Sequence, residues 1–173
     1  GITHWIKVDG NPGALITAYQ DWTASASPAE PEVAASGDDL LFIMYTSGTT
    51  GLPKGVMHSH NTVLWSLLTI AATSDFRYKD RFLNSLPMFH VGALTPAISC
   101  IFVGNTLAIM RTFDPAVSWQ IIDNEKITTT LMVPAMLQFM LAAYKPDEHT
   151  IATLRWVMSG AAPVPVSLIK AYA

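Results

Sequence analysis

A chain of 173 residues has the length of one domain, and with half of its residues hydrophobic and 13% charged it is not a disordered protein. The net charge of −3, without a basic cluster, argues against nucleic acid as the main partner. The single cysteine, Cys100, can form no internal disulfide and lies in an apolar run, so we expect a small buried residue in a cytoplasmic protein.

The stretch from Phe82 to Met110 contains no Asp, Glu, Lys or Arg, which raises the question of a membrane span. Pro87, Pro96 and the Gly104-Asn105 turn divide it into short elements, so it predicts a buried helix with flanking strands. The chain begins without a charged stretch followed by an apolar core, and no signal peptide is expected. We therefore expect no spanning segment, while peripheral association with a membrane stays open.

The first 39 residues predict little regular structure. His4–Val8 has the pattern of a strand, Gly10–Gly13 that of a turn, and Leu15–Trp22 a weak helical spacing. Residues 24–37 are rich in Ala, Ser, Pro and Glu and indicate a connector. We thus expect an N-terminal strand and connector over residues 1–39, followed by an α/β subdomain over residues 40–173.

A loop rich in Thr, Ser and Gly, Tyr45–Gly55, follows the apolar run Leu40–Met44, which predicts a buried strand. Glycines allow backbone N–H groups to approach an anion closely, hydroxyls add donors, and Lys54 adds a positive charge. These features predict a polyphosphate site, although a flexible surface loop would share the composition. The lysine spacing differs from that of the common P-loop, and Val56–His60 predicts a second strand, so the expected unit is strand–loop–strand.

Two histidines, His58 and His60, alternate along this second strand and could share a metal, but no third ligand lies nearby in sequence. Residues 61–74 have helical spacing, with Asn61 as the expected N-cap. Phe82–Leu86 predicts a strand that ends at Pro87–His90. A lone histidine in this position is either a packed residue or a functional one.

The remaining elements alternate between helices and strands. We expect helices over residues 92–103, after Asp114 and Pro115, from Pro134, and from about Val166. We expect strands over residues 106–110, 128–133 and 155–159. This alternation predicts a layered α/β fold with a mostly parallel sheet flanked by helices. Ligands gather at the carboxyl ends of such strands, and each candidate segment follows a strand.

Tyr45–Gly55 resembles the signature loop of the adenylate-forming, AMP-binding enzymes, which include acyl-CoA synthetases, aryl-CoA ligases and luciferases. The resemblance implies that the loop binds the β- and γ-phosphates of ATP, with Mg²⁺, while a carboxylate attacks the α-phosphorus. It assigns a catalytic role to Lys54. The implied phosphate-binding residues are Thr46, Ser47, Gly48, Thr49, Thr50, Gly51 and Lys54.

Two further segments are similar to motifs of the same family. Pro87, Phe89 and His90 match a Pro-x-Phe-His motif of fatty-acyl and aryl-CoA ligases, in which the histidine orients the carboxylate. By this resemblance His90 is catalytic, and Val91 and Gly92 complete the acyl site. Residues 159–163 read either as an ordinary strand-to-helix turn or as the segment that lines the adenine. The second reading gives nucleotide contacts to Gly160, Ala161, Ala162 and Pro163.

The resemblance implies a fragment of an ATP-dependent carboxylate–CoA ligase that makes an acyl-adenylate and then an acyl-CoA, with a medium- or long-chain fatty acid expected. Later family motifs would lie beyond Ala173, so we expect no activity from this chain alone, and it offers no metal-binding set. The alternatives are an ATP- or polyphosphate-binding module without catalysis, an aryl-CoA ligase and a fatty-acyl-AMP ligase.

Overall fold

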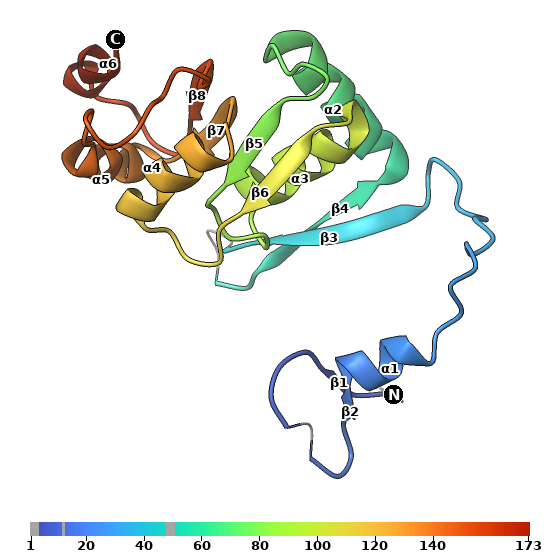
Figure 1. Cartoon of the computed structure of the whole chain (residues 1–173). Coiled ribbons are helices and arrows are strands. Elements are labelled where there is room, and N and C mark those ends of the chain that lie inside the picture. Colours follow the sequence, from blue (N-terminus) through green and yellow to red (C-terminus); the bar gives the residue numbers. More distant parts are fainter. Residues whose placement is uncertain (1–3, 12, 48–50) are drawn as a thin grey trace. The chain divides into compact units, whose positions relative to one another are not determined.

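The computed structural model describes residues 4–11, 13–47 and 51–173 (Figure 1). Backbone contacts divide the chain into two units, residues 1–35 and residues 36–173. In the first unit, β1 (Ile6–Lys7) pairs in parallel with β2 (Thr17–Ala18), and α1 (Tyr19–Ala24) follows. The expected helix therefore starts later than its pattern indicated, because its first residues pair with β1. Residues 25–39 contain no helix or strand, as a connector should.

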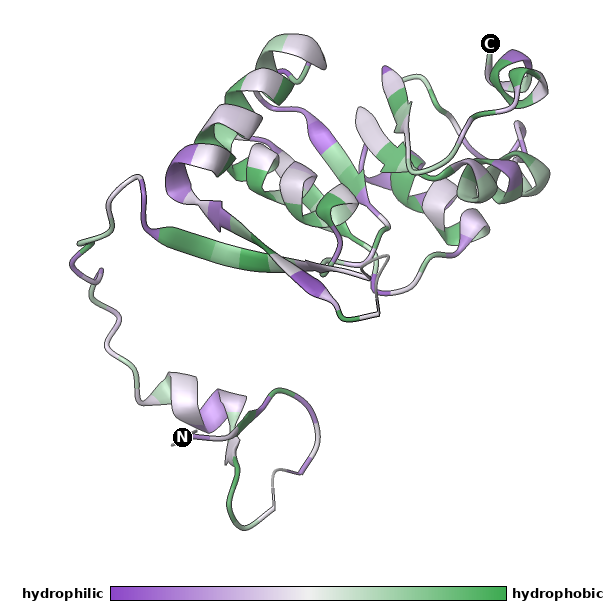
Figure 2. Ribbon diagram, turned by 180° about the vertical axis from the view of Figure 1, so that it is seen from behind, coloured by the Kyte–Doolittle hydropathy of each residue, from purple (hydrophilic) through white to green (hydrophobic). Residues whose placement is uncertain are grey.

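The second unit begins with a hairpin of β3 (Leu40–Thr46) and β4 (Lys54–Ser59). The strands are antiparallel and form their own two-stranded sheet, which confirms the strand–loop–strand unit. The expectation that the first strand is buried is wrong. Leu40 is 50% exposed and Ile43 44% exposed, although Figure 2 shows hydrophobic residues along most of β3. Within the described residues a two-stranded sheet leaves much of this apolar strand accessible.

The helix after the hairpin, α2 (His60–Thr73), starts one residue before its expected position. Its N-cap is Ser59, not Asn61. The Ser59 hydroxyl accepts from the Thr62 N–H, and the Thr62 hydroxyl accepts from the Ser59 N–H, forming a reciprocal capping box. Asn61 instead donates its backbone N–H to the Gly37 carbonyl. Ser59 and Asn61 are both good N-cap residues and lie only two positions apart. The sequence near the helix does not show the contact of Asn61 with Gly37, so it could not decide between them.

A four-stranded parallel sheet forms the centre of the second unit. Its order is β6-β5-β7-β8, with parallel pairing at each step. The order confirms the expected layered α/β fold with a parallel sheet. Asp114 accepts a hydrogen bond from the Val117 N–H, which confirms it as the N-cap of α4. The strands are β5 (Arg81–Asn84), β6 (Thr106–Ile109), β7 (Thr129–Met132) and β8 (Trp156–Ser159), and the helices are α3 (Val91–Val103), α4 (Pro115–Asn124), α5 (Pro134–Ala143) and α6 (Val166–Tyr172).

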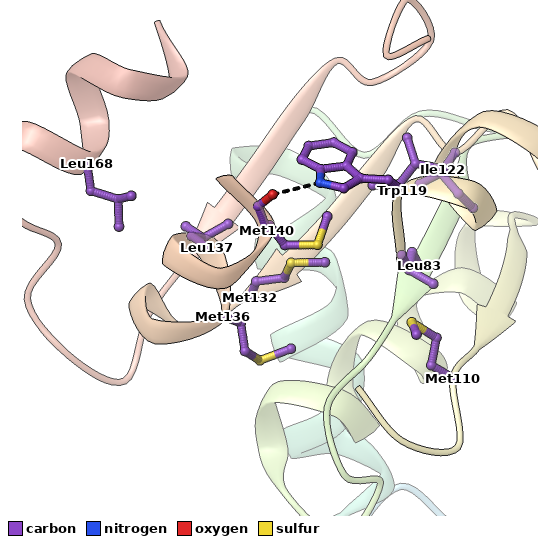
Figure 3. Packing of buried hydrophobic residues seen from close by; sticks show 10 residues of the cluster. Leu83, Met110, Trp119, Ile122, Met132, Met136, Leu137, Met140 and Leu168 are labelled. Carbon is purple, nitrogen blue, oxygen red and sulfur yellow. Dashed lines mark hydrogen bonds between the residues drawn. The ribbon is translucent and has the colours of Figure 1, made fainter. Parts of the chain in front are cut away.

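One face of this sheet packs on α4, α5 and α6. Alternate strand residues, such as Leu83 and Met132, point to this face because side chains alternate along a strand. Trp119 of α4 donates its indole N–H to the Met140 carbonyl of α5 at 2.7 Å (Figure 3). The buried methionines of this cluster fill core space between helix and sheet, a role that their flexible side chains suit. They are Met110, Met132, Met136 and Met140.

The opposite face contains a smaller cluster of Phe76, Phe82 and Cys100. Cys100 on α3 is 1% exposed, and burial raises the pKa of its thiol to about 12. The expectation of a small buried cysteine is confirmed, and its raised pKa disfavours the reactive thiolate. The uncharged run from Phe82 to Met110 forms most of β5, all of α3 and β6. Across the described part of the chain, no helix combines the length and the apolar character that crossing a bilayer requires.

Candidate functional site

The described part of the Thr/Ser/Gly loop lies at the end of the β3–β4 hairpin. Thr46 is the last residue of β3 and faces Lys54, the first residue of β4, across the ladder. The Thr46 hydroxyl makes a long hydrogen bond of 3.5 Å to the Lys54 carbonyl. Ser47 and Lys54 are exposed, and Gly51 has a φ of 104°, which favours glycine. Gly48, Thr49 and Thr50 lie outside the described residues.

Among the described residues, no third ligand joins His58 and His60 to form a metal site. The His58 ring packs on the Phe42 ring with 4.8 Å between the centroids. Over the described ranges, 4–11, 13–47 and 51–173, no three His, Cys, Asp or Glu residues come together as metal ligands. The metal alternative for the two histidines therefore receives no support from their surroundings.

The second segment, Pro87–Gly92, joins β5 to α3. His90 is the N-cap of α3, and its Nδ1 accepts from the Gly92 N–H at 3.1 Å. A Cβ added to Gly92 would lie 3.2 Å from the Leu86 side chain, so a glycine allows this tight entry into the helix. Phe89 is 83% exposed, and His90 is exposed beside it. Both side chains are therefore accessible to a bound molecule.

Asn84, the last residue of β5, forms hydrogen bonds that hold this segment in place. It was not predicted as a site residue from the sequence. Its side chain is 1% exposed. The amide donates to the Met88 sulfur at 2.9 Å and to the Ala93 carbonyl at 3.3 Å, and its oxygen accepts from the Leu86 N–H. The signal in the sequence is a single amide directly after the apolar residues Phe82 and Leu83, at a strand end where burial requires hydrogen bonds.

The third segment, residues 160–163, follows β8 directly. Ala161 has a φ of 69°, in the left-handed region that disfavours a side chain. Gly160 has open space around a hypothetical Cβ, and Ala161, Ala162 and Pro163 are exposed. The backbone at this turn is thus both strained and accessible.

Replacing Ala161 with glycine should raise the free energy of unfolding by roughly 0.5 to 1 kcal/mol. The change removes a left-handed penalty of about 1–2 kcal/mol and adds a glycine entropy cost of about 0.5–1 kcal/mol. Urea unfolding of both proteins measures the difference. Ala162→Gly is the matched control and should lower stability, because Ala162 does not have a positive φ. Equal destabilisation by both substitutions would contradict the strain at Ala161.

The structure brings two of the three predicted segments to one edge of one sheet. β5 and β8 run parallel with β7 between them, so Pro87–Gly92 and residues 160–163 both follow carboxyl ends. Each of the three segments follows a strand, as expected, but the strand before the Thr/Ser/Gly loop, β3, belongs to the separate sheet of the hairpin. Two buried hydroxyls, Ser85 and Ser159, lie beside these carboxyl ends and have no hydrogen-bond partner among the described residues. Ser159 belongs to the predicted segment 159–163, whereas Ser85 was not predicted as a site residue.

An ion-pair cluster lies at the amino edge of the same sheet. Arg155 donates to Asp80 at 2.6 Å and to Asp75 at 2.7 Å. Asp80 is 4% exposed and also accepts from the Thr128 hydroxyl, while its N–H donates to the Asn105 side chain. Asp80 directly precedes β5 and is hydrogen-bonded to the residues that directly precede β6, β7 and β8. One residue thus links the amino ends of all four strands. No local pattern in the sequence predicts this cluster, because its members are up to 80 residues apart.

This arrangement is a layered α/β domain with candidate ligand segments at the carboxyl edge of a parallel sheet. Comparison with known proteins defines the family. The chain belongs to the AMP-binding enzyme family, whose model matches residues 4–173.

The relatives are ligases that use coenzyme A. The chain is 44% identical over 172 residues to the long-chain-fatty-acid–CoA ligase FadD13 of Mycobacterium tuberculosis, covering 99% of this chain and 33% of the relative. It is 36% identical to the indoleacetate–CoA ligase of Aromatoleum aromaticum, covering 95% of this chain and 32% of the relative. The chain therefore spans about one third of the length of these relatives.

A solved structure supports the fold. The inhibitor-bound N-terminal domain of FACL13 from Mycobacterium tuberculosis matches with a TM-score of 0.85 and 45% sequence identity. The match covers 91% of this chain and 40% of that structure. The expected fold class, part of the N-terminal domain of an acyl-CoA synthetase, is confirmed.

Proposed function

We propose that the chain is part of an ATP-dependent carboxylate–CoA ligase. In the first step the carboxylate oxygen of the acid attacks the α-phosphorus of ATP, and pyrophosphate leaves. In the second step the thiol of CoA attacks the acyl-adenylate, forming acyl-CoA and releasing AMP. The observation that carries this proposal is the strand–loop–strand unit, in which Lys54 and Thr46 face each other at the mouth of a hydroxyl-rich loop. A lone buried thiol is compatible with a cytoplasmic location.

The residues have distinct proposed roles. Lys54 and the loop hydroxyls stabilise the negative charge that develops on the leaving pyrophosphate. His90 orients the carboxylate, and the turn after β8 lets its backbone approach the adenine. The phosphate-binding set is Thr46, Ser47, Gly48, Thr49, Thr50, Gly51 and Lys54, and the proposed adenine contacts are Gly160, Ala161, Ala162 and Pro163. The acyl site is Pro87, Phe89, His90, Val91 and Gly92.

Mg²⁺ would supply further charge compensation for the phosphates. The described residues hold no cluster of three His, Cys, Asp or Glu side chains. Mg²⁺ beside substrate phosphates needs only one or two carboxylates from the protein, and we assign no residue and no step to the metal here. The 173 residues alone should show no turnover, in line with their coverage of about one third of the relatives.

The test is pyrophosphate release and acyl-CoA formation by the complete protein that contains this chain, across octanoate, palmitate, phenylacetate and indoleacetate. His90→Asn should lower kcat/KM at least about tenfold while stability is retained, because asparagine also caps a helix. His90→Ala should lower both activity and stability. Undiminished activity in His90→Asn would contradict the role of the imidazole, and ATP binding without adenylation of any acid would favour a binding module.

The indoleacetate–CoA ligase supports an aryl acid as the second candidate substrate, because it matches this chain at 36% identity. The panel of four acids separates fatty acids from aryl acids directly. Preference for phenylacetate or indoleacetate over both fatty acids would establish the aryl alternative.

A further inference from the structure

An apolar cavity of about 200 Å³ lies between the sheet and the helices α2 and α3. One end is lined by Val91 and Gly92, the first residues of α3, which directly follow His90. Leu131 of β7 and Met158 of β8 line it nearby and pair with each other across the strands. Thr95 is the one lining residue with a hydroxyl. One end of the cavity therefore lies beside the proposed carboxylate site, and its lining suits an apolar group.

Aromatic rings line the other end of the cavity. Phe82 of β5 and Trp156 of β8 are both level with Thr129 of β7. Leu131 and Met158 are two residues further along, so the two levels are about 6.6 Å apart at the strand rise of about 3.3 Å per residue. The Phe76 ring contacts both other rings, with centroids 5.8 Å from Phe82 and 5.7 Å from Trp156. These three rings form the floor of the cavity.

The ion-pair cluster fixes this floor from the amino edge. Asp75 immediately precedes Phe76, and Arg155 immediately precedes Trp156. The Arg155 guanidinium binds the Asp75 carboxylate at 2.7 Å, the Asp75 carbonyl at 3.2 Å and the Asp80 carboxylate at 2.6 Å. Moving the two rings apart would break these charge-assisted bonds, and a buried charge would lose its partner. Displacing the rings of the floor therefore requires breaking these bonds.

The size of the cavity limits what it can contain. A dry engineered cavity of about 150 Å³ binds benzene, so a cavity of this size accepts a phenyl ring or a short aliphatic tail. A long straight chain would collide with the floor. We infer that Phe76 and Trp156 limit the length of the acyl group, and that the substrate is a medium-chain or single-ring aryl acid. This inference rests on the proposed ligase function.

The experiment compares kcat/KM for octanoate, phenylacetate and palmitate in the complete protein. The wild type should use octanoate or phenylacetate at least about tenfold better than palmitate, because pocket fit discriminates by about 10- to 200-fold. Trp156→Ala should raise kcat/KM for palmitate about tenfold relative to octanoate. Phe76→Leu should shift the ratio in the same direction and provides the test if Trp156→Ala does not fold.

Trp119→Phe is the matched control, since it alters a tryptophan on the opposite face of the sheet. It should leave the palmitate-to-octanoate ratio unchanged. Equal use of palmitate and octanoate by the wild type would overturn the inference, as would a ratio unaffected by the Trp156 and Phe76 variants while octanoate is still activated. Failure to activate any acid would overturn the ligase function itself, which is a different result.

Discussion

Lys54→Ala should lower the rate of acyl-adenylate formation by about 10²- to 10³-fold in the complete protein. Lys54 is an exposed residue at the mouth of the loop, opposite Thr46. Removing one preorganised group that stabilises developing negative charge typically costs that factor. Single-turnover pyrophosphate release, started with saturating acid and ATP, measures the chemical step separately from product release.

The controls distinguish a phosphate contact from a general effect of charge. Lys145→Ala removes a lysine that pairs with Glu148 on the surface, and it should leave the rate unchanged. Lys54→Arg should restore part of the rate, because it keeps the charge but not the compact ammonium. A Lys54→Ala protein with wild-type single-turnover kinetics would remove Lys54 from the proposed mechanism.

Arg155→Met should lower the free energy of unfolding by about 3–5 kcal/mol, the usual cost of breaking a buried ion pair from one side. Asp80 is 4% exposed and would lose the guanidinium 2.6 Å away, keeping only its bonds to the Arg77 N–H and the Thr128 hydroxyl. Methionine keeps most of the side-chain volume, so the loss reports charge and not packing. Urea unfolding followed by circular dichroism measures it.

Arg77→Met is the matched control, because Arg77 pairs with Asp75 at 62% and 55% side-chain exposure. It should cost far less than Arg155→Met, since solvent screens an exposed pair. The Arg77 side chain, followed by that of Arg155, lowers the pKa of Asp75. A lowered pKa gives stability above the ordinary carboxyl pKa of about 4, lost as the pH falls below it. Arg77→Met should weaken this acid dependence, and equal losses in both variants would contradict the buried pair.

Local sequence signals were sufficient for most elements of the second unit. Asp114 and Pro115 start α4 as expected, because an N-cap and a first-turn proline act within a few residues. Pro134 likewise starts α5, and Gly104 ends α3 with a φ of 83°. The choice between Ser59 and Asn61 as N-cap depended on a contact with Gly37, which local sequence does not encode.

The candidate site was predictable in its parts but not in its assembly. The loop and the His90 segment each combine their candidate functional groups in adjacent residues, which is why motifs could single them out as candidates. Whether a strand joins one sheet or another depends on long-range pairing, so the separate sheet of the hairpin could not be foreseen. The same holds for Asp80 and Arg155, which meet across 75 residues. Buried hydroxyls such as Ser85 become noticeable only when burial is known.

The hydrogen bond between Gly92 and His90 determines how the imidazole can act. Because Nδ1 accepts from the Gly92 N–H, the proton of the neutral ring resides on Nε2. The free nitrogen is then a donor, which suits a carboxylate or phosphate oxygen and offers nothing to an amine or another N–H. A second proton on Nδ1 would face the Gly92 N–H and break the cap of α3. The proposed recognition of an anion and the observed start of α3 therefore require the same tautomer.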